Sequence, residues 1–371
     1  MNPKDTLRPD VLQFTPYSPG LSIDEIKERY NLSSVIKMAS NENPLGASPL
    51  VRRVLSRRAE AVFRYPQSGN PKLVQALAQH HKVPAQCVVP GNGSDEIIDL
   101  ILRVKARPGL DNVVVFHPSF SLYRLQARLC GLELRQVPLP GDFRFPLPAM
   151  LSVSDENTAL MFITNPDNPS GYALPAKDLI ALARSIPPRA LLVVDEAYVE
   201  FAEPEEDYSL MGSLAELPNV VILRTFSKVY GLAGLRLGFG VMPDWLADLL
   251  MRVRLPFSVN LLAEAAGLAA LEDVHFRQAT LETVRRGRQW LTSELERLGC
   301  QVFPSQANFL MVTPPAPAQA QAIFEGLLAK GIIIRGLASY GLPDMLRISV
   351  GSESENRAFI SALESLLPGH A

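Results

Sequence analysis

Between residues 87 and 241, short runs of apolar, mostly β-branched residues alternate with stretches in which apolar residues recur every three or four positions. Runs of this length without a polar face are typical of strands buried on both sides. We predict six of them, at residues 87–89, 113–116, 159–164, 190–194, 220–224 and 237–241. Because helical stretches separate these strands, the pattern predicts an α/β fold with a mostly parallel sheet flanked by helices.

Helical spacing dominates the rest of the chain. We predict helices near residues 23–30, 49–61, 71–81, 258–273, 275–298 and 353–367. After Cys300, short apolar runs such as NFLMV and GIIIRG return among helical stretches, which indicates a smaller α+β unit. We therefore expect three parts: an N-terminal arm that includes part of the small domain at 1–45, a large domain at 46–262, and a small C-terminal domain at 263–371.

Charge and cysteine content exclude several classes of protein. The 371 residues carry a formal net charge of −2, and the basic residues are not clustered, so we expect no nucleic-acid partner. Cys87, Cys130 and Cys300 lie far apart without C-x-x-C spacing, so we expect neither a disulfide framework nor a metal site. No stretch is apolar enough for a signal peptide or a membrane span, which favours a soluble, cytoplasmic protein.

The most unusual stretch is LRTFSKVYGLAGLRLGF, at residues 223–239. Lys228 follows a run apolar enough to be a buried strand, whereas most lysines lie on solvated helix faces. Thr225 and Ser227 precede it, and Arg236 follows eight positions later. A lysine carried into a cleft loses hydration and its pKa falls, and Schiff-base chemistry requires such an amine.

GNGSDE, at residues 91–96, lies between a predicted strand and a predicted helix. Glycines such as Gly93 let the backbone approach a ligand, and Ser94 or Asp95 at the helix start leaves N–H groups pointing outward. These features predict an anion cup. The stretch lacks the GK[ST] of a Walker loop and the third glycine of a dinucleotide fingerprint. The alternative is an ordinary capped helix start.

Three other predicted strands end in loops with candidate binding groups. Phe120 could form a flat wall for a heteroaromatic ring, or belong to the core. Asn168, in the rigid turn NPDNPSG, could bind a phenolic oxygen, or the loop could be a plain turn. Asp195 ends the most apolar strand, with Tyr198 three residues on, and a carboxylate there needs a cation from a ligand or from a core salt bridge.

Two arginines lie beside predicted strands of the C-terminal unit. Arg347 is flanked by Leu346 and Ile348, so it points away from them and faces either solvent or an anion. Arg335 ends an apolar run and has the same two interpretations.

Together these groups meet the requirements of pyridoxal phosphate. The cofactor needs a lysine for a Schiff base, an anion cup and an arginine for its phosphate, a carboxylate for its ring nitrogen, and donors for its ring oxygen. The chain presents them in the order cup, aromatic wall, amide, carboxylate with tyrosine, lysine and arginine.

The motifs from about residue 38 to 352 resemble those of fold-type I aminotransferases, most closely the histidinol-phosphate aminotransferases. The matching stretches are NENPLG, RYP, GNGSDE, NPDNPSG, VVDEAYVEF, LRTFSKVYGLAGLRLGF and LRISVG. The resemblance implies the fold of that class, pyridoxal 5′-phosphate as cofactor, a homodimer, and transfer of an amino group from L-histidinol phosphate to 2-oxoglutarate in histidine biosynthesis. Aromatic aminotransferases and threonine-phosphate decarboxylases have similar motifs and are alternatives. A non-catalytic protein that binds a phosphate ligand is an alternative of another class.

The resemblance also implies a role for each matching residue. Lys228 would form the Schiff base and shuttle a proton, Asp195 would keep the ring nitrogen protonated, and Phe120 would stack on the ring. Tyr198 and Asn168 would bind the ring oxygen. The residues implied to hold the phosphate are Gly93, Ser94, Asp95, Thr225, Ser227 and Arg236, with Tyr65 from the neighbouring subunit. The residues implied to bind substrate are Tyr17, Asn43, Tyr65, Asn168, Arg335 and Arg347, of which Arg347 would clamp a carboxylate.

Two positions depart from the family pattern. Phe120 stands where the family often has tyrosine, which keeps the stacking surface but removes a hydroxyl. NPDNPSG replaces the more usual NPNNPTG, so Asp167 adds a charge.

Overall fold

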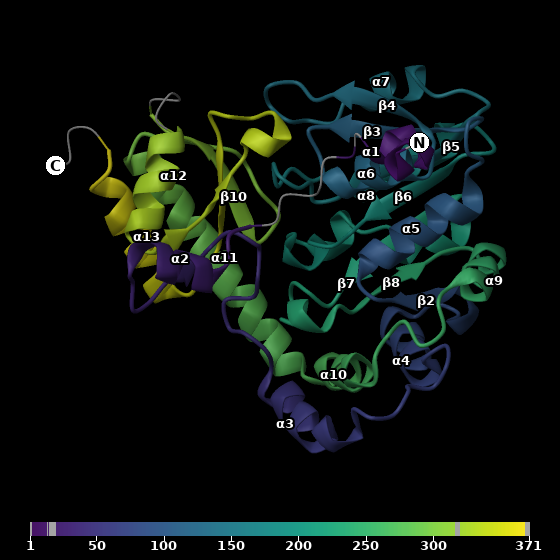
Figure 1. Cartoon of the computed structure of the whole chain (residues 1–371), viewed down its shortest axis with the longest axis horizontal. Helices are drawn as coiled ribbons and strands as arrows, with labels where there is room; N and C mark the ends of the chain where they lie inside the picture. The colour runs from purple at the N-terminus through teal and green to yellow at the C-terminus, as the bar shows by residue number, and fades with distance from the viewer. Residues whose placement is uncertain (1, 13, 15–19, 316–319, 368–371) are drawn as a thin grey trace.

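A computed structural model of the chain describes residues 2–12, 14, 20–315 and 320–367. The described elements form two lobes, a larger one built on a seven-stranded sheet and a smaller one built on a four-stranded sheet (Figure 1). No helix among these residues is long and apolar enough to cross a membrane.

The sheet of the larger lobe has the strand order β2-β8-β7-β6-β5-β3-β4. Its strands are β2 (Val88–Gly91), β3 (Asn112–His117), β4 (Glu133–Pro138), β5 (Thr158–Thr164), β6 (Leu191–Asp195), β7 (Val220–Thr225) and β8 (Gly238–Val241). All neighbours pair in parallel except β8, which is antiparallel to both β2 and β7. The prediction of a mostly parallel sheet is confirmed, and so are the six predicted strands.

Apolar side chains cover both faces of this sheet, as the unbroken apolar runs predict. One face packs on α5 (Ser94–Lys105), α6 (Ser121–Leu129) and α9 (Asp244–Val253), and the other on α7 (Leu147–Ser152) and α8 (Ala176–Ser185). Alternation along β7 illustrates this, because Val221 and Leu223 face the first group while Val220 and Ile222 face the second. The edge strand β4 was not predicted, since Val137 is its only buried residue and its other side chains are largely polar.

Three further helices cover the sheet edge formed by β2 and β8. They are α3 (Pro49–Arg58), α4 (Pro71–His81) and α10 (Leu261–Glu272), and α10 packs against the other two. The predicted domain boundary at residue 263 therefore falls inside a helix that lies with the larger lobe. The division into domains remains a prediction. The short helix α1 (Pro9–Leu12) contacts α6.

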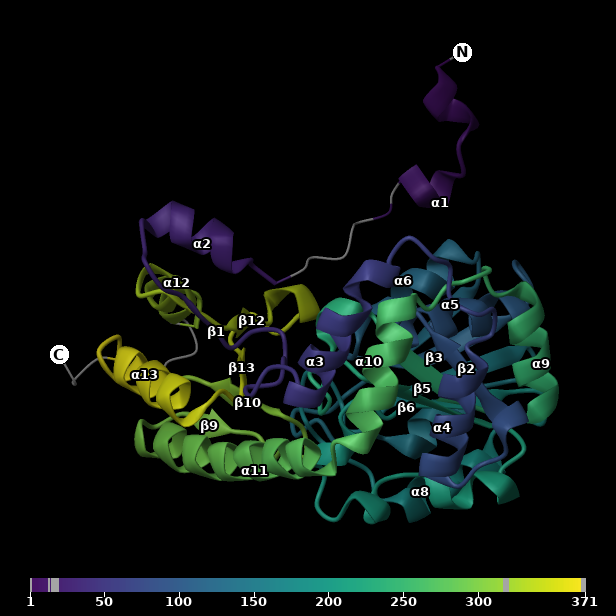
Figure 2. The same cartoon turned by 90° about the horizontal axis from the view of Figure 1, so that it is seen from below.

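The smaller lobe combines chain segments from both termini. Its antiparallel sheet has the order β12-β13-β10-β9. Its elements are α11 (Val274–Arg297), β9 (Gln301–Val302), β10 (Phe309–Thr313), α12 (Ala320–Ala329), β11 (Ile332–Ile333), β12 (Arg335–Gly336), β13 (Leu346–Ser349) and α13 (Glu353–Glu364). From the N-terminal side, β1 (Ile36–Lys37) pairs with β11, and α2 (Ile23–Tyr30) buries Ile26 against Leu328 and Ile333. Figure 2 shows α2 and β1 with the elements of the smaller lobe.

Candidate active site

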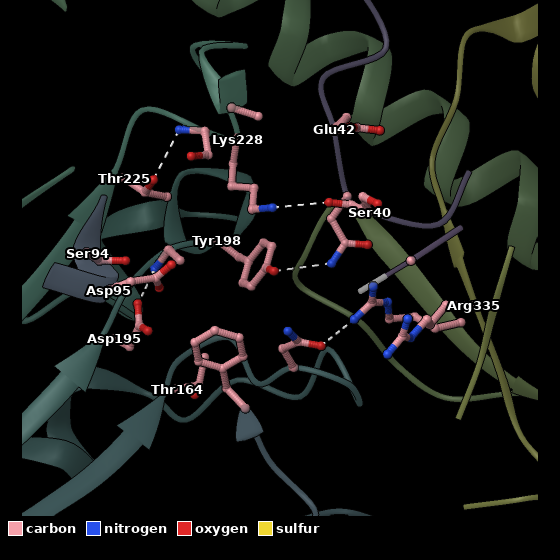
Figure 3. Close-up of a pocket in the computed structure, with 18 of the residues that line it drawn as sticks. Ser40, Glu42, Ser94, Asp95, Thr164, Asp195, Tyr198, Thr225, Lys228 and Arg335 are labelled. Carbon is pink, nitrogen blue, oxygen red and sulfur yellow. Dashed lines mark hydrogen bonds between the residues drawn. The ribbon is translucent and has the colours of Figure 1, made fainter. Parts of the chain in front are cut away.

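A cleft of about 270 Å³ opens where the carboxyl ends of β5, β6 and β7 face the smaller lobe (Figure 3). In open α/β sheets this edge is where ligands bind. The cleft is lined by Gly20, Ala39, Ser40, Asn41, Glu42, Ser94, Asp95, Phe120, Thr164, Asn168, Asp195, Ala197, Tyr198, Thr225, Ser227, Lys228, Ala233, Arg236, Arg335, Tyr340 and Arg347.

Lys228 extends into this cleft from the loop after β7. Its Nζ donates to the backbone oxygen of Ser40 at 3.2 Å and lies 5.4 Å from the ring centre of Tyr198. Loss of hydration in the cleft, and then the nearby charge of Arg347, lower the pKa of Lys228 to about 8. The amine is therefore partly uncharged near neutral pH, as the sequence predicts for a nucleophile.

The loop that carries Lys228 is braced by the NENPLG loop. Asn43 donates to the backbone oxygen of Val229 at 2.8 Å and to the Thr280 hydroxyl at 3.2 Å. A Cβ at Gly231 would lie 2.0 Å from the backbone oxygen of Gly46, so the two loops touch closely only because Gly231 has no side chain. Asn43 does not line the cleft, and both amide hydrogens are engaged. Asn43 therefore braces the loop of Lys228, and its implied contact with substrate stays a prediction.

The predicted anion cup forms at the N-terminus of α5. Gly93 precedes the helix with φ of +80°, and a Cβ there would lie 2.7 Å from a guanidinium nitrogen of Arg236. A Cβ at Gly238 would lie 2.4 Å from the backbone nitrogen of Ser94, so β8 runs directly against this turn. Arg236 donates to Asp95 at 3.1 Å from the opposite loop. Helix N–H groups and a guanidinium thus face one small volume, which suits a phosphate.

Asp195 is buried at the end of β6 and forms no ion pair with a described residue. Tyr123 donates to its carboxylate at 2.8 Å and accepts from the Thr164 hydroxyl at 2.8 Å, and the Ala197 N–H donates at 3.2 Å. Burial raises the pKa of Asp195 to about 6 despite these donors. A cationic ring nitrogen in the cleft would supply the missing partner and favour the ionised carboxylate.

The smaller lobe contributes a guanidinium to the opposite wall. One guanidinium N–H of Arg347 donates to the Asn168 side-chain oxygen, and another donates to the backbone oxygen of Ala39 at 2.7 Å. Its Nε is buried without a partner among the described residues. The Tyr198 hydroxyl accepts from Asn41 at 3.2 Å nearby. Both predicted donors for a ring oxygen, Tyr198 and Asn168, therefore lie in the cleft.

Several residues in or beside the cleft were not anticipated from the sequence. Thr164 and Tyr123 orient Asp195, Ser40 accepts from Lys228, and Tyr340 joins Arg335 at the far end of the cleft. Figure 3 shows Ser94, Asp95 and Asp195 on one side of Tyr198 and Arg335 on the other. The cleft therefore has an anion-binding group at each end.

Tyr65, an implied site residue, does not line the cleft of its own chain. Tyr65 is 79% exposed and stacks on Phe257, with ring centres 4.7 Å apart. The implied role of Tyr65 is to reach the phosphate in the site of a neighbouring subunit, and this role stays a prediction. Tyr17 lies outside the described residues.

The donor set fits pyridoxal phosphate. The cup, which a side chain at Gly93 would fill, suits the phosphate of the cofactor. The buried carboxylate of Asp195 suits its ring nitrogen, and the partly uncharged Lys228 suits its aldehyde. Among the described residues no cluster of His, Cys, Asp and Glu suited to a metal ion is present.

Comparisons with known proteins agree with this chemistry. The family model of "Aminotransferase class I and II" matches residues 33–363. The histidinol-phosphate aminotransferase of Oleidesulfovibrio alaskensis is 58% identical over 365 residues, covering 98% of this chain and 95% of that protein. The enzyme of the same name from Nitratidesulfovibrio vulgaris is 56% identical over 368 residues, covering 99% and 98%.

A solved structure with similar architecture is the histidinol-phosphate aminotransferase of Sinorhizobium meliloti in complex with pyridoxal-5′-phosphate. It superposes with a TM-score of 0.88 at 28% identity, and the match covers 97% of each chain.

Proposed function

This chain belongs to the class I and II aminotransferase family, and we propose that it transfers the amino group of L-histidinol phosphate to 2-oxoglutarate, with pyridoxal 5′-phosphate as cofactor. The products are imidazole acetol phosphate and glutamate, and the reaction is reversible and belongs to histidine biosynthesis. The observation that carries the proposal is the cleft itself. It combines a phosphate cup, an unpaired buried carboxylate and a desolvated lysine with two arginines at the far end.

The residues of the larger lobe would hold the cofactor. Its phosphate fits the α5 N-terminus, the hydroxyls of Thr225 and Ser227, and Arg236. Phe120 would cover the ring, and Lys228 would hold the cofactor covalently. When bound, the cofactor acts as an electron sink that stabilises negative charge on the substrate carbon bearing the nitrogen.

Lys228 is also the base that moves the proton. Its Nζ would take the proton from the substrate carbon bearing the amino group, because the pKa of about 8 leaves a neutral fraction near neutral pH. Ser40 accepts from this amine and fixes its direction. Asp195, held by Tyr123, would keep its negative charge against the ring nitrogen.

The two arginines explain how one cleft accepts both substrates. Histidinol phosphate carries a phosphate on the carbon where an amino acid has its α-carboxylate, whereas 2-oxoglutarate has a carboxylate at each end. A guanidinium binds either anion through paired N–H donors. Arg347 and Arg335 both line the cleft, so we assign them to these anions.

We propose a homodimer as the active form. Tyr65 does not reach the cleft of its own chain, and it lies on an exposed apolar surface. This surface consists of Val62, Phe63, Tyr65, Leu255 and Phe257, which are 41–79% exposed. We also propose the cytoplasm as the location, since Cys87, Cys130 and Cys300 are all free thiols.

Mixing two inactive variants tests the shared site. Tyr65→Ala and Lys228→Ala chains, once combined, should regain up to about a quarter of the activity, because half of the dimers are hybrids with one intact site each. No recovery from chains that do exchange would argue against a contribution of Tyr65 across the interface.

Steady-state rates with histidinol phosphate, phenylalanine and tyrosine as donors test the substrate. We expect kcat/KM for histidinol phosphate to exceed the others by at least about tenfold, because only this donor brings a dianionic phosphate to the arginines. A preference for phenylalanine or tyrosine would make the enzyme an aromatic aminotransferase. Release of carbon dioxide from threonine phosphate without glutamate formation would make it a decarboxylase. A colourless protein that turns over none of these would overturn the proposal.

A further inference from the structure

Asp167 is a buried carboxylate whose role the family pattern leaves open. It has no exposed surface, and it forms no ion pair with any described residue. Burial raises its pKa to about 6. A buried charge without a cation is costly unless hydrogen bonds satisfy it, so its contacts identify what it does.

The Asp167 carboxylate joins the loops that follow β3 and β5. One oxygen accepts from the Ser119 hydroxyl at 3.2 Å. The other accepts from the Ser170 hydroxyl at 2.7 Å and from the Ser170 N–H at 3.2 Å. Ser119 precedes Phe120, and Asn168 follows Asp167 directly, so both loops carry a group of the cofactor site.

The same loop reaches the smaller lobe. The backbone oxygen of Gly171 accepts from the Gln306 N–H at 2.9 Å, and a Cβ at Gly171 would lie 2.2 Å from the Ser305 hydroxyl. Asn168 accepts from Arg347 of β13. The turn around Asp167 therefore contacts the smaller lobe through both its backbone and its side chains.

We propose that Asp167 is a positioning residue, which holds Phe120, Asn168 and, through Asn168, Arg347 in the arrangement that binds cofactor and substrate. This inference rests on the proposed function. The hydrogen bonds account for this role, because two donors come from Ser170 in the same turn and a third comes from Ser119 in the loop after β3.

An asparagine at this position would satisfy most of the same donors. Its single oxygen can accept from the Ser170 N–H, which cannot rotate, and its amide can donate to the Ser119 hydroxyl, which can. Asp167→Asn should therefore behave like the unaltered enzyme. Asp167→Ala removes every acceptor and leaves the donors unsatisfied.

The test compares these two variants by cofactor affinity, by the visible circular dichroism of the bound cofactor, and by KM and kcat for both substrates. For Asp167→Ala we expect the cofactor Kd and both KM values to rise about tenfold, together with a changed dichroic band. The variant loses all three hydrogen bonds, but the cofactor site is affected only through the neighbouring Phe120 and Asn168. Asp167→Asn should remain within about threefold of the unaltered enzyme.

Asp111→Ala is the matched control. Asp111 is equally buried but pairs with Arg107 and Arg189 outside the cleft. The Asp111→Ala variant should have a lower melting temperature than the unaltered enzyme but the same KM values and the same dichroic band. If Asp167→Ala is too unstable to purify, Ser119→Ala cuts only the link between the two loops, and it should raise the cofactor Kd about threefold.

Two results would overturn the proposal. Asp167→Ala could resemble the Asp111→Ala control, which means a purely structural role, or Asp167→Asn could be as impaired as Asp167→Ala, which means that charge is what matters. Failure of the unaltered enzyme to bind the cofactor would instead count against the proposed function.

Discussion

Two groups of buried charges lie side by side on the same strands and are treated in opposite ways. Asp195 and Glu196 are consecutive, and so are Arg224 and Thr225. Because side chains alternate along a strand, Asp195 and Thr225 line the cleft while Glu196 and Arg224 face the other side of the sheet. In the cleft neither Asp195 nor Lys228 has an ion-pair partner among the described residues.

On the other side the charges pair with one another, and we call this group the ionic cluster (Arg224, Glu196, Glu200 and Glu205). Arg224 is 2% exposed and donates to Glu196 at 2.9 Å, to Glu200 at 3.1 Å and to Glu205 at 3.0 Å. Burial alone would lower the pKa of Arg224, but the carboxylates raise it above its ordinary value.

The contrast separates structure from chemistry. Mutual pairing in the ionic cluster ties the end of β6 to the end of β7. In the cleft, Asp195 and Lys228 have no ion-pair partner among the described residues, which destabilises the cofactor-free protein and prepares it to bind a polar cofactor. Substitutions in the cleft should therefore reduce activity, whereas substitutions in the ionic cluster should reduce stability.

Lys228→Met should have the largest effect. It removes both the covalent link and the base, so kcat should fall by at least about 10⁴-fold. The pKa of Lys228 falls from 10.5 in the unfolded chain to about 8 in the folded protein, so the folded protein binds fewer protons between these two pH values. The resulting loss of folding stability is complete below about pH 8. The cofactor-free variant should thus be more stable at pH 7, by about 1–3 kcal/mol, in urea unfolding.

Lys105→Met is the control for that experiment, because burial also lowers the pKa of Lys105 but its helix end lies outside the cleft. It should keep full activity. A Lys228→Met enzyme that retains activity would remove the lysine from the mechanism.

Asp195→Asn should reduce kcat/KM by about 10³-fold, since the ring nitrogen loses its anion. The pKa of Asp195 is about 6 in the folded protein and 3.8 in the unfolded chain. The stability that protonated Asp195 contributes is therefore fully present below pH 3.8 and is lost as the pH rises through 6. The cofactor-free variant should therefore be more stable than the unaltered protein at pH 8, by about 2 kcal/mol, and equal to it at pH 4. Melting curves at both pH values measure this.

The neighbouring change Glu196→Gln is the control for activity. It should keep kcat/KM within about tenfold, because Glu196 does not line the cleft and Arg224 retains Glu200 and Glu205 as partners. A loss of kcat/KM as large as that of Asp195→Asn would mean that the two sides of the sheet do not differ as we describe.

The sequence predicted the strands and the loops at their ends, because apolar runs and turn residues are local signals. It located Lys228, Asp195 and the α5 cup for the same reason, since each directly follows a strand. It did not predict that Tyr123 reaches Asp195, 72 positions away, because no local pattern reports which side chain crosses between two strand ends. The bracing role of Asn43 was not predicted for the same reason, since its motif is recognisable in the sequence but its hydrogen bonds to Val229 and Thr280 are not.

The ionic cluster was also invisible in the sequence. Arg224 lies in a run that indicates a buried strand, and its partners Glu196, Glu200 and Glu205 follow another strand. Only the structure shows that these three carboxylates lie against Arg224 and offset its positive charge. The departure at Asp167 likewise gained a physical explanation only from its three donors.

Arg224→Met should lower the free energy of unfolding by about 3–4 kcal/mol, because it leaves buried carboxylates without a cation. The folded enzyme should keep kcat/KM within about tenfold, since no cleft residue is altered. Urea titrations of the cofactor-free protein measure the first effect, and rates at low temperature measure the second. Adding Glu196→Gln and Glu200→Gln to the variant should restore most of the stability, and a failure to do so would mean that lost packing of Arg224 dominates.

Tyr123→Phe should have the smallest effect and lies at the boundary between the two regions. The ring stays stacked on Phe162, but Asp195 loses its donor and the Thr164 hydroxyl loses its acceptor. The pKa of Asp195 in the cofactor-free protein should rise further, so a larger fraction is protonated at pH 6. The cofactor Kd should therefore rise by about tenfold at pH 6, but by only about threefold at pH 8. Tyr230→Phe, beside the ionic cluster, should show no such pH dependence. A pH-independent loss for Tyr123→Phe would mean that the hydroxyl only packs the strand ends and does not tune Asp195.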